Sequence, residues 1–169
     1  MITIENSQIY SDYENLFVFQ KQFGNDYIES IKKYCLLTNV KNDIFPNSMN
    51  WKMYIIKYCN NICGIIGFYK FSDNEYWIGW FGILEEFRNK GIGSFVLNKL
   101  IDIIKEENYE ANKLLLYTEC DNLLAHKFYK KNGMDYLSTV DEYCLNNNLR
   151  KEKYFSLMTI GDIIIYKNI

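Results

Sequence analysis

The chain has 169 residues, of which 49% are hydrophobic and 17% aromatic, so a largely disordered protein is excluded and a single domain over 1–169 is expected. Its formal net charge of −2 and sequence pI of about 5.5 argue against a general nucleic-acid binder. Its longest apolar runs have the length of strands, so we expect no membrane partner.

Five cysteines and the polar start of the sequence predict reduced thiols and a cytoplasmic location, because no secretory signal is recognisable. Cys59 and Cys63 raise the question of a zinc site. Their spacing and the distance to the single histidine, His126, do not fit one, so we expect two strand cysteines and no metal.

The first third of the chain is predicted to be helical and then irregular. Residues 11–37 favour two helices that are broken near Gly24, with Ser11 or Asp12 as the first cap. The only proline, Pro46, lies in the polar stretch NDIFPNSMN, which indicates a loop.

Three consecutive antiparallel strands are predicted next, from WKMYIIKY, ICGIIGFYKF and EYWIGWFGIL. These segments are rich in aromatic and β-branched residues and are separated by the turn-forming stretches CNN and SDN. The stretch FRNKGIGSF follows, and after it SFVLNKLIDIIKEEN has apolar residues at helical spacing. The spacing predicts an amphipathic helix of about four turns.

The last third of the chain begins with KLLLYTE, 113–119, which reads as a buried strand. A short helix is predicted to follow, capped by Asp121 or Asn122 and ended at Gly133. Two further strands are expected at 135–144 and 153–160. The strand–helix–strand crossover at 75–119 implies one parallel pair inside a mixed, mostly antiparallel sheet flanked by helices, an α/β fold.

Glycines at the mouth of a helix can form an anion site. The first amides of a helix have no internal partner, and glycine lets a phosphate approach the backbone. Arg88 and Lys90 add positive charge beside Gly91 and Gly93. A plain surface turn is an equally good explanation of these glycines. The stretch matches neither a P-loop nor a dinucleotide-binding fingerprint, since Val96 stands where the third glycine would be.

Two motifs in this order resemble the GNAT superfamily of N-acetyltransferases over about residues 51–160. The first, Gln/Arg-x-x-Gly-x-Gly/Ala, reads Arg88-Asn89-Lys90-Gly91-Ile92-Gly93 between a strand and a long helix. The second follows the next strand, and its matching positions are Asn122, Ala125, Phe128, Tyr129, Lys131 and Gly133. Met134 stands where the family usually has phenylalanine.

The resemblance implies a GNAT-like fold with acetyl-CoA as cofactor and a cofactor core at about 75–134. The family's fourth and fifth strands, here 75–84 and 113–119, would be parallel and splayed. Loop amides would hold the pyrophosphate, and the strand near Ile83 would offer backbone groups to the pantetheine arm. The residues that the resemblance assigns to the cofactor are Ile83, Arg88, Asn89, Lys90, Gly91, Ile92, Gly93, Ser94, Asn122 and Tyr129.

The reaction implied by the family is acetyl transfer to a primary amine of a small molecule or peptide. Tyr129 is the expected general acid for the departing thiolate, against the alternative that it is simply a buried aromatic. Glu119, at the end of the buried strand, ranks first as general base, although an ion-paired strand end is equally compatible. Glu75 and Glu85 are the other candidates, and His126 is expected to be a surface residue without a role.

Acceptor recognition in this family comes from the first helices and the late strands, here 20–50 and 138–152. Acidic residues there could attract a cationic amine and aromatic residues could form walls: Asp26, Glu29, Asp43, Asp141 and Glu142, and Tyr27, Phe45 and Trp51. A non-catalytic acyl-CoA sensor is the competing function. The sequence does not fix the oligomeric state, and a homodimer is one option.

Overall fold

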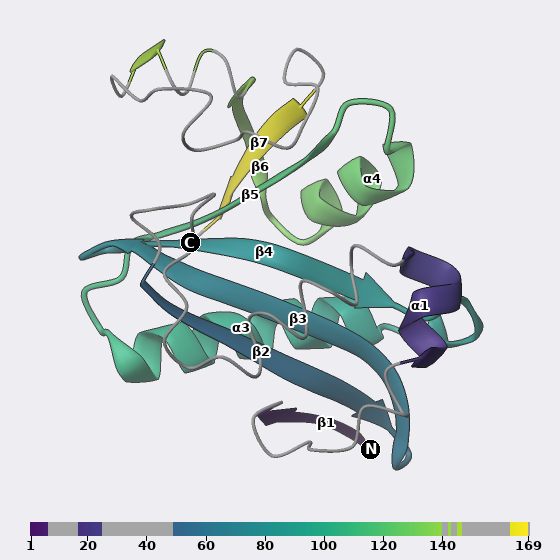
Figure 1. Ribbon diagram of the computed structural model, residues 1–169. Coiled ribbons are helices and arrows are strands. Elements are labelled where there is room, and N and C mark those ends of the chain that lie inside the picture. Colours follow the sequence, from purple (N-terminus) through teal and green to yellow (C-terminus); the bar gives the residue numbers. More distant parts are fainter. Residues whose placement is uncertain (7–16, 25–48, 140–141, 143–144, 147–162, 169) are drawn as a thin grey trace. The chain divides into compact units, whose positions relative to one another are not determined.

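The computed structural model describes residues 1–6, 17–24, 49–139, 142, 145–146 and 163–168 (Figure 1). Its elements, in chain order, are β1 (Ile2–Asn6), α1 (Phe17–Phe23), β2 (Met49–Tyr58), β3 (Asn61–Ser72), β4 (Glu75–Ile83), the 3-10 turn η3 (Glu85–Phe87), α3 (Ile92–Glu107), β5 (Lys113–Glu119), α4 (Leu123–Lys131), β6 (Asp135–Thr139) and β7 (Ile163–Asn168). No helix within these ranges is both long and apolar enough to cross a membrane.

The strands form one seven-stranded mixed sheet in the order β1-β2-β3-β4-β5-β7-β6. The three strands predicted at 51–84, the helix after the glycine loop and the strand–helix unit at 113–131 are all confirmed. Two strands were not predicted: β1, which pairs antiparallel with β2, and β7, which lies between β5 and β6. The strand expected at 153–160 falls outside the described residues. The one expected at 135–144 is observed as β6 and ends at Thr139, and its expected continuation is wrong at Glu142, which is helical, whereas 140–141 and 143–144 are not described.

The turn between β2 and β3 shows why these strands form a hairpin. Cys59 and Asn60 have φ angles of 49° and 67°, so both central residues of the two-residue turn are left-handed. This is the geometry of a type I′ turn, whose twist matches that of paired strands. Cys59 therefore belongs to a turn, which corrects its expected place in a strand, whereas Cys63 lies buried in β3.

The parallel pair that the crossover predicted is present and splayed. β4 and β5 share a ladder of three residue pairs, from Glu75↔Lys113 to Trp77↔Leu115. β4 continues to Ile83 and β5 to Glu119, but their ladder ends at Trp77↔Leu115, whereas β7 pairs with the other edge of β5 from Leu114 to Glu119. The two strands therefore part after Trp77, as expected for the GNAT-like fold.

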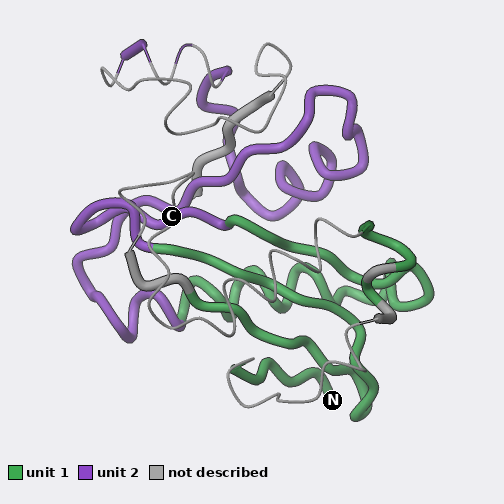
Figure 2. The backbone as a smooth tube through the Cα atoms, in the orientation of Figure 1, with its two compact units in different colours: residues 1–40, 50–69, 79–102 green, residues 41–49, 70–78, 103–169 purple. Residues whose placement is uncertain are grey.

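The chain divides into two compact units, and the division passes through β3, β4 and α3 (Figure 2). Unit 1 holds residues 1–40, 50–69 and 79–102. Its core packs the helix α1 onto strands through Phe19, with Met53, Ile55, Ile65 and Leu84 buried around it. Gly24 has a φ of 83°, a left-handed conformation typical of the residue after a helix, so α1 ends where the sequence predicted a break.

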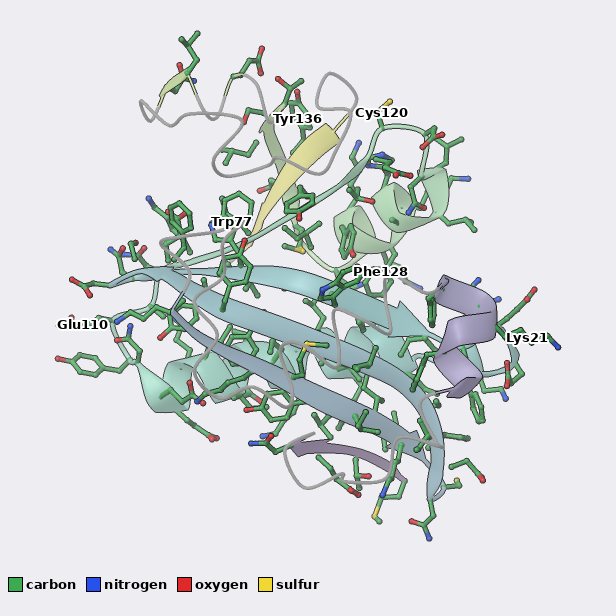
Figure 3. The ribbon with its side chains drawn as sticks, viewed as in Figure 1. Lys21, Trp77, Glu110, Cys120, Phe128 and Tyr136 are labelled. Carbon is green, nitrogen blue, oxygen red and sulfur yellow. The ribbon has the colours of Figure 1, made fainter. Side chains whose placement is uncertain are left out.

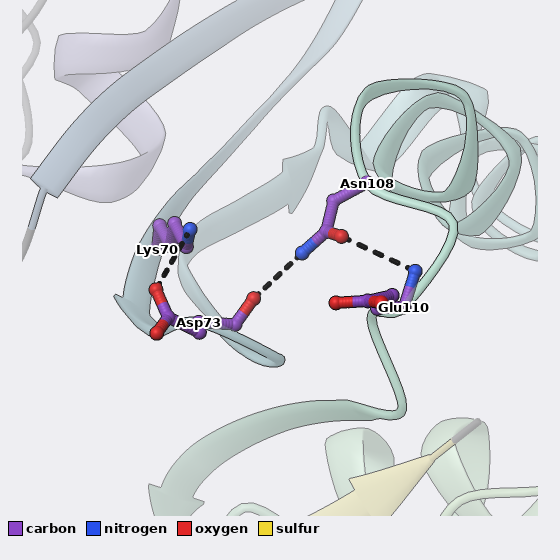
Figure 4. A network of polar contacts seen from close by, with 4 residues as sticks. All are labelled: Lys70, Asp73, Asn108 and Glu110. Carbon is purple, nitrogen blue, oxygen red and sulfur yellow. Dashed lines mark hydrogen bonds and ion pairs between the residues drawn. The ribbon is translucent and has the colours of Figure 1, made fainter.

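Unit 2 holds residues 41–49, 70–78 and 103–169, and a polar network fixes its loops. Asn108, after α3, donates its side-chain N–H to the carbonyl of Asp73 at 2.6 Å and accepts the amide of Glu110 at 3.2 Å (Figure 4). The carboxylate of Asp73 pairs with Lys70 at 3.4 Å. This network ties the β3–β4 turn to the loop that leads into β5.

Candidate active site

The predicted cofactor loop is an ordered turn between η3 and α3. Asn89 and Gly91 have φ angles of 61° and 76°, both in the left-handed region. A Cβ placed on Gly91 would meet no heavy atom within 4 Å, so the space in front of this residue is open. The turn thus combines an exposed backbone with a conformation that glycine adopts without strain.

The backbone amides of this turn are available to a ligand. No amide from Asn89 to Ser94 has a hydrogen-bond partner among the described residues, and the first helical bond runs from the Phe95 amide to the Gly91 carbonyl at 3.1 Å. Unpaired amides at the start of a sixteen-residue helix carry partial positive charge. That this turn binds a phosphate group stays a prediction.

The Arg88 side chain is already engaged within the turn. Its Nε–H donates to the carbonyl of Ile83 at 2.9 Å, and Ile83 is the residue expected to offer backbone groups to pantetheine. The Arg88 side chain therefore connects the start of the loop to the last residue of β4, in addition to adding positive charge. This intramolecular bond was not predicted from the sequence.

The Lys90 side chain is engaged as well. Its Nζ donates to the Glu86 carbonyl at 2.9 Å and lies 5.2 Å from the ring centroid of Phe87 and 5.9 Å from that of Tyr58. A cation over aromatic faces is stabilised by the ring quadrupole. These contacts attach the Lys90 side chain to η3 and to Tyr58, so it stabilises the loop. From the sequence, Lys90 was expected only to add positive charge for a phosphate.

Asn122 caps α4 at its N-terminus. Its side-chain oxygen accepts the amide of Ala125 at 3.2 Å, which confirms one of the two caps that the sequence offered. The cap uses one of the two lone pairs of this oxygen, so the other lone pair and the side-chain NH2 group remain for the cofactor contact that the family resemblance implies.

Tyr129 is the one buried residue of α4, with 9% of its surface exposed. Its ring packs edge-on against Phe128, with centroids 5.2 Å apart, and Phe128 is labelled in Figure 3. Burial raises the pKa of Tyr129 to about 12, because desolvation disfavours the phenolate. The hydroxyl is therefore a neutral donor throughout the physiological range, and a weaker acid than an exposed tyrosine.

Glu119 ends β5 with an exposed side chain. No ion pair of its carboxylate is present among the described residues, so the expected alternative of a paired strand end finds no support there. Its carbonyl accepts the amide of Asn122 at 3.1 Å and lies 2.9 Å from Nε2 of His126. His126 Nε2 also lies 3.1 Å from the Cys120 carbonyl, so this histidine, whose contacts are exposed, binds the corner between β5 and α4.

Glu75, an alternative general base, is 5% exposed and lies in the first residue pair of the β4–β5 ladder, Glu75↔Lys113. Its Oε1 accepts the indole N–H of Trp77 at 2.8 Å, and its Oε2 lies 3.4 Å from Nζ of Lys113. A carboxylate in these contacts stabilises the ladder. Glu85, the other alternative, is exposed at the start of η3.

Of the residues expected to recognise the acceptor, Glu142 is described with its contacts. Its carboxylate accepts the amide of Thr139 at 3.2 Å, and the Thr139 hydroxyl accepts the amide of Glu142, also at 3.2 Å. These reciprocal bonds form a capping box, so the carboxylate has a local structural partner. Asp26, Tyr27, Glu29, Asp43, Phe45 and Asp141 lie outside the described residues, and Trp51 is described only as part of β2.

Metal ligands were not expected. Within the described ranges no three His, Cys, Asp or Glu side chains are arranged to hold a metal ion. Cys59, Cys63 and Cys120 are not disulfide-bonded, and burial raises the pKa of the Cys63 thiol to about 11.

A family model described as the acetyltransferase (GNAT) family matches residues 12–134. The chain therefore belongs to the GNAT acetyltransferase family, as its two motifs indicated. Among curated proteins, the chain is similar to protein OPG050 of variola virus (isolate Human/India/Ind3/1967). The two are 33% identical over 66 residues, which are 38% of this chain and 92% of the viral protein.

Solved structures with the same fold include two acetyltransferases with the cofactor bound. A Bacillus subtilis acetyltransferase in complex with CoA has a TM-score of 0.65 at 12% identity, over 99% of this chain and 97% of that one. A GNAT family acetyltransferase from Elizabethkingia anophelis with acetyl-CoA bound has a TM-score of 0.66 at 19% identity, over 98% and 96%. At these identities the likeness concerns the fold.

Proposed function

We propose that the chain transfers an acetyl group from acetyl-CoA to a primary amine of a small molecule or peptide. The observation that carries the proposal is the row of amides from Asn89 to Ser94, which have no partner in the described part of the chain, around the open, left-handed Gly91. Membership of the GNAT acetyltransferase family supports acetyl-CoA as cofactor, and so do the two structural neighbours crystallised with CoA or acetyl-CoA.

The loop amides would hold the pyrophosphate in this proposal, and Arg88 would keep the end of β4 attached to the loop while adding positive charge. A hydrogen bond from Asn122 to the cofactor is assigned on family resemblance. The acetyl thioester would supply the electrophilic carbonyl. A loop that is already shaped by Arg88 and Lys90 binds with less ordering of its own backbone, which favours affinity.

Glu119 is proposed to accept the proton of the attacking amine, directly or through water. As the C–N bond forms and the C–S bond breaks, Tyr129 would give its proton to the leaving sulfur. A phenol of pKa about 12 is a weak acid, but the desolvation that raises it would also raise the pKa of a thiol buried beside it. The pKa difference between the phenol and the thiol is then smaller than it would be if desolvation raised the pKa of the tyrosine alone.

The acceptor itself is assigned only as an amine, bound by 20–50 and 138–152. A cytoplasmic location is part of the proposal, supported by three cysteines that form no disulfide. So is a single N-acetyltransferase domain over 1–169, while a homodimer stays one option for the assembly.

Two measurements test the proposed function. Titration calorimetry with CoA should give a binding heat with correctly folded protein. Thiol release from acetyl-CoA should then be followed across a panel containing spermidine, kanamycin, lysine methyl ester and a dipeptide amide, and at least one amine should be acetylated. Tight CoA binding without turnover of any amine would favour the acyl-CoA sensor, and no binding would overturn both functions.

A further inference from the structure

The helix α1 touches the segment that leads into the cofactor loop. The side-chain oxygen of Gln22 accepts the backbone amide of Glu85 at 3.1 Å, and Glu85 is the first residue of η3. The two residues are 63 positions apart in the sequence, and both lie in unit 1. Figure 1 shows α1 beside the end of β4, where this contact is made.

A close packing contact fixes the position of α1 at this point. The Phe23 ring lies against the backbone of Gly82, where an added Cβ would be only 2.8 Å from the ring carbon Cζ. Phe23 stacks on Phe19 with centroids 6.1 Å apart, and Phe19 is fully buried in the core of unit 1. Because these contacts hold the last turn of α1, Gln22 meets the Glu85 amide without first having to be ordered.

The hydrogen bond between Gln22 and Glu85 lies next to two backbone hydrogen bonds that form η3. The Phe87 amide donates to the Leu84 carbonyl at 2.9 Å, the Arg88 amide donates to the Glu85 carbonyl at 3.0 Å, and the loop follows at once. Fixing the Glu85 peptide therefore fixes the direction in which η3 enters the loop. Gln22 comes from α1, far away in the sequence, and its side chain binds the backbone of η3 at Glu85.

We infer that Gln22 is a positioning residue for the cofactor loop, so that CoA affinity depends on the docking of α1. The inference depends on the proposed function, because it takes the loop to be the pyrophosphate site. It also means that the region proposed for acceptor recognition, which includes the last residues of α1, shares one hydrogen bond with the cofactor region. Cofactor binding and the placement of α1 are then thermodynamically coupled.

The two ends of the bond can be removed separately. Gln22→Met keeps the length of the side chain and removes the acceptor oxygen. Glu85→Pro removes the donor N–H and suits this position, since proline is favoured at the start of a helix. Leu84, with φ −57° and ψ 143°, already has the extended conformation that a following proline requires. Glu85→Ala is the matched control, because it loses the same carboxylate and keeps the N–H.

The test is calorimetric titration with CoA at a temperature where circular dichroism shows every variant folded. Loss of one hydrogen bond should weaken CoA binding about three- to tenfold in Gln22→Met, and similarly in Glu85→Pro relative to Glu85→Ala. The double variant should be no weaker than either single one, since both remove the same bond. Amide exchange at Glu85, followed by NMR, should be faster in Gln22→Met.

Three outcomes can be distinguished. If wild-type protein binds no CoA, the proposed function fails and this inference fails with it. If wild-type protein binds but Gln22→Met binds equally well, the inference alone is overturned. It is also overturned if the losses in Gln22→Met and Glu85→Pro add in the double variant, because the two substitutions would then act through different contacts.

Discussion

At the residue scale, Gly91 has two properties that different substitutions separate. Its left-handed φ of 76° strains any residue with a Cβ, but the space in front of it is open. Gly91→Ala should lower stability by about 1 kcal/mol through backbone strain. Gly91→Asn should cost less, because asparagine tolerates this region, and its side chain should nevertheless obstruct a phosphate.

We therefore expect Gly91→Asn to have a melting temperature close to that of wild type and at least about tenfold weaker CoA binding, or ~1.4 kcal/mol. Thermal unfolding and calorimetry measure the two effects. If Gly91→Asn binds CoA like wild type, the loop is the plain surface turn that the sequence also allowed.

The buried phenol of Tyr129 gives a second prediction at this scale. Tyr129→Phe should reduce kcat about 10²- to 10⁴-fold, the range of a lost general acid, with CoA affinity nearly unchanged. Because burial raises the pKa of Tyr129 to about 12, its ionisation should produce no basic limb in the wild-type rate profile below about pH 11. An unchanged kcat in Tyr129→Phe would leave this tyrosine as a packing residue only.

Residue identity was predictable from the sequence where a motif has a local cause, and less so where a partner is distant. The cap at Asn122 and the left-handed Gly91 follow from their neighbours along the chain. The bond from Arg88 to Ile83 spans five residues in a turn whose shape no pattern specifies, and the Gln22 contact depends on how a helix packs onto β4. Such contacts are consequences of the tertiary fold.

At the scale of elements, the β4–β5 pair distinguishes its two carboxylates. Glu75 lies in the ladder, bonded to Trp77 and near Lys113, whereas Glu119 lies at the other end of β5. Glu75→Gln should lower stability by about 1–3 kcal/mol, because it weakens a buried charged hydrogen-bond network. Glu119→Gln should leave the melting temperature unchanged and remove the acid limb of the kcat profile.

The comparison of these two variants needs thermal unfolding and pH–rate measurements on both. A Glu119→Gln variant with an unmoved acid limb would exclude this residue as the base. If Glu75→Gln instead lost the limb without losing stability, the base would be assigned to β4.

Element boundaries were predictable for the hairpin strands, for the crossover helix α3 and for α4, since each has a clear period and turn residues at its ends. The order of the late strands was not. β7 carries a short apolar run at the end of the sequence and is inserted between β5 and β6, so its position depends on pairing with β5 over six residue pairs. Local periodicity contains no information on which neighbour a strand will choose.

At the scale of the whole molecule, the described residues of each compact unit include a buried thiol or phenol whose pKa is raised by burial. The pKa of the Cys63 thiol, in unit 1, is raised from 9.0 to about 11, and the pKa of the Tyr129 phenol, in unit 2, is raised from 10.0 to about 12. In both cases the folded state holds its proton to a higher pH than the unfolded state. The free energy of unfolding should therefore fall as pH rises, by about 2–3 kcal/mol per group over two pH units.

The pH range over which Cys63 lowers the free energy of unfolding overlaps only in part with the range for Tyr129. The pH dependence can therefore be followed for each unit separately. The loss of stability that begins near pH 9 belongs to Cys63 and should be absent in Cys63→Ala, and the loss that begins near pH 10 belongs to Tyr129 and should be absent in Tyr129→Phe. Because β3, β4 and α3 each run through both units, we expect one cooperative transition in urea whose midpoint responds to both substitutions. Two transitions, each sensitive to only one substitution, would show instead that the units unfold independently.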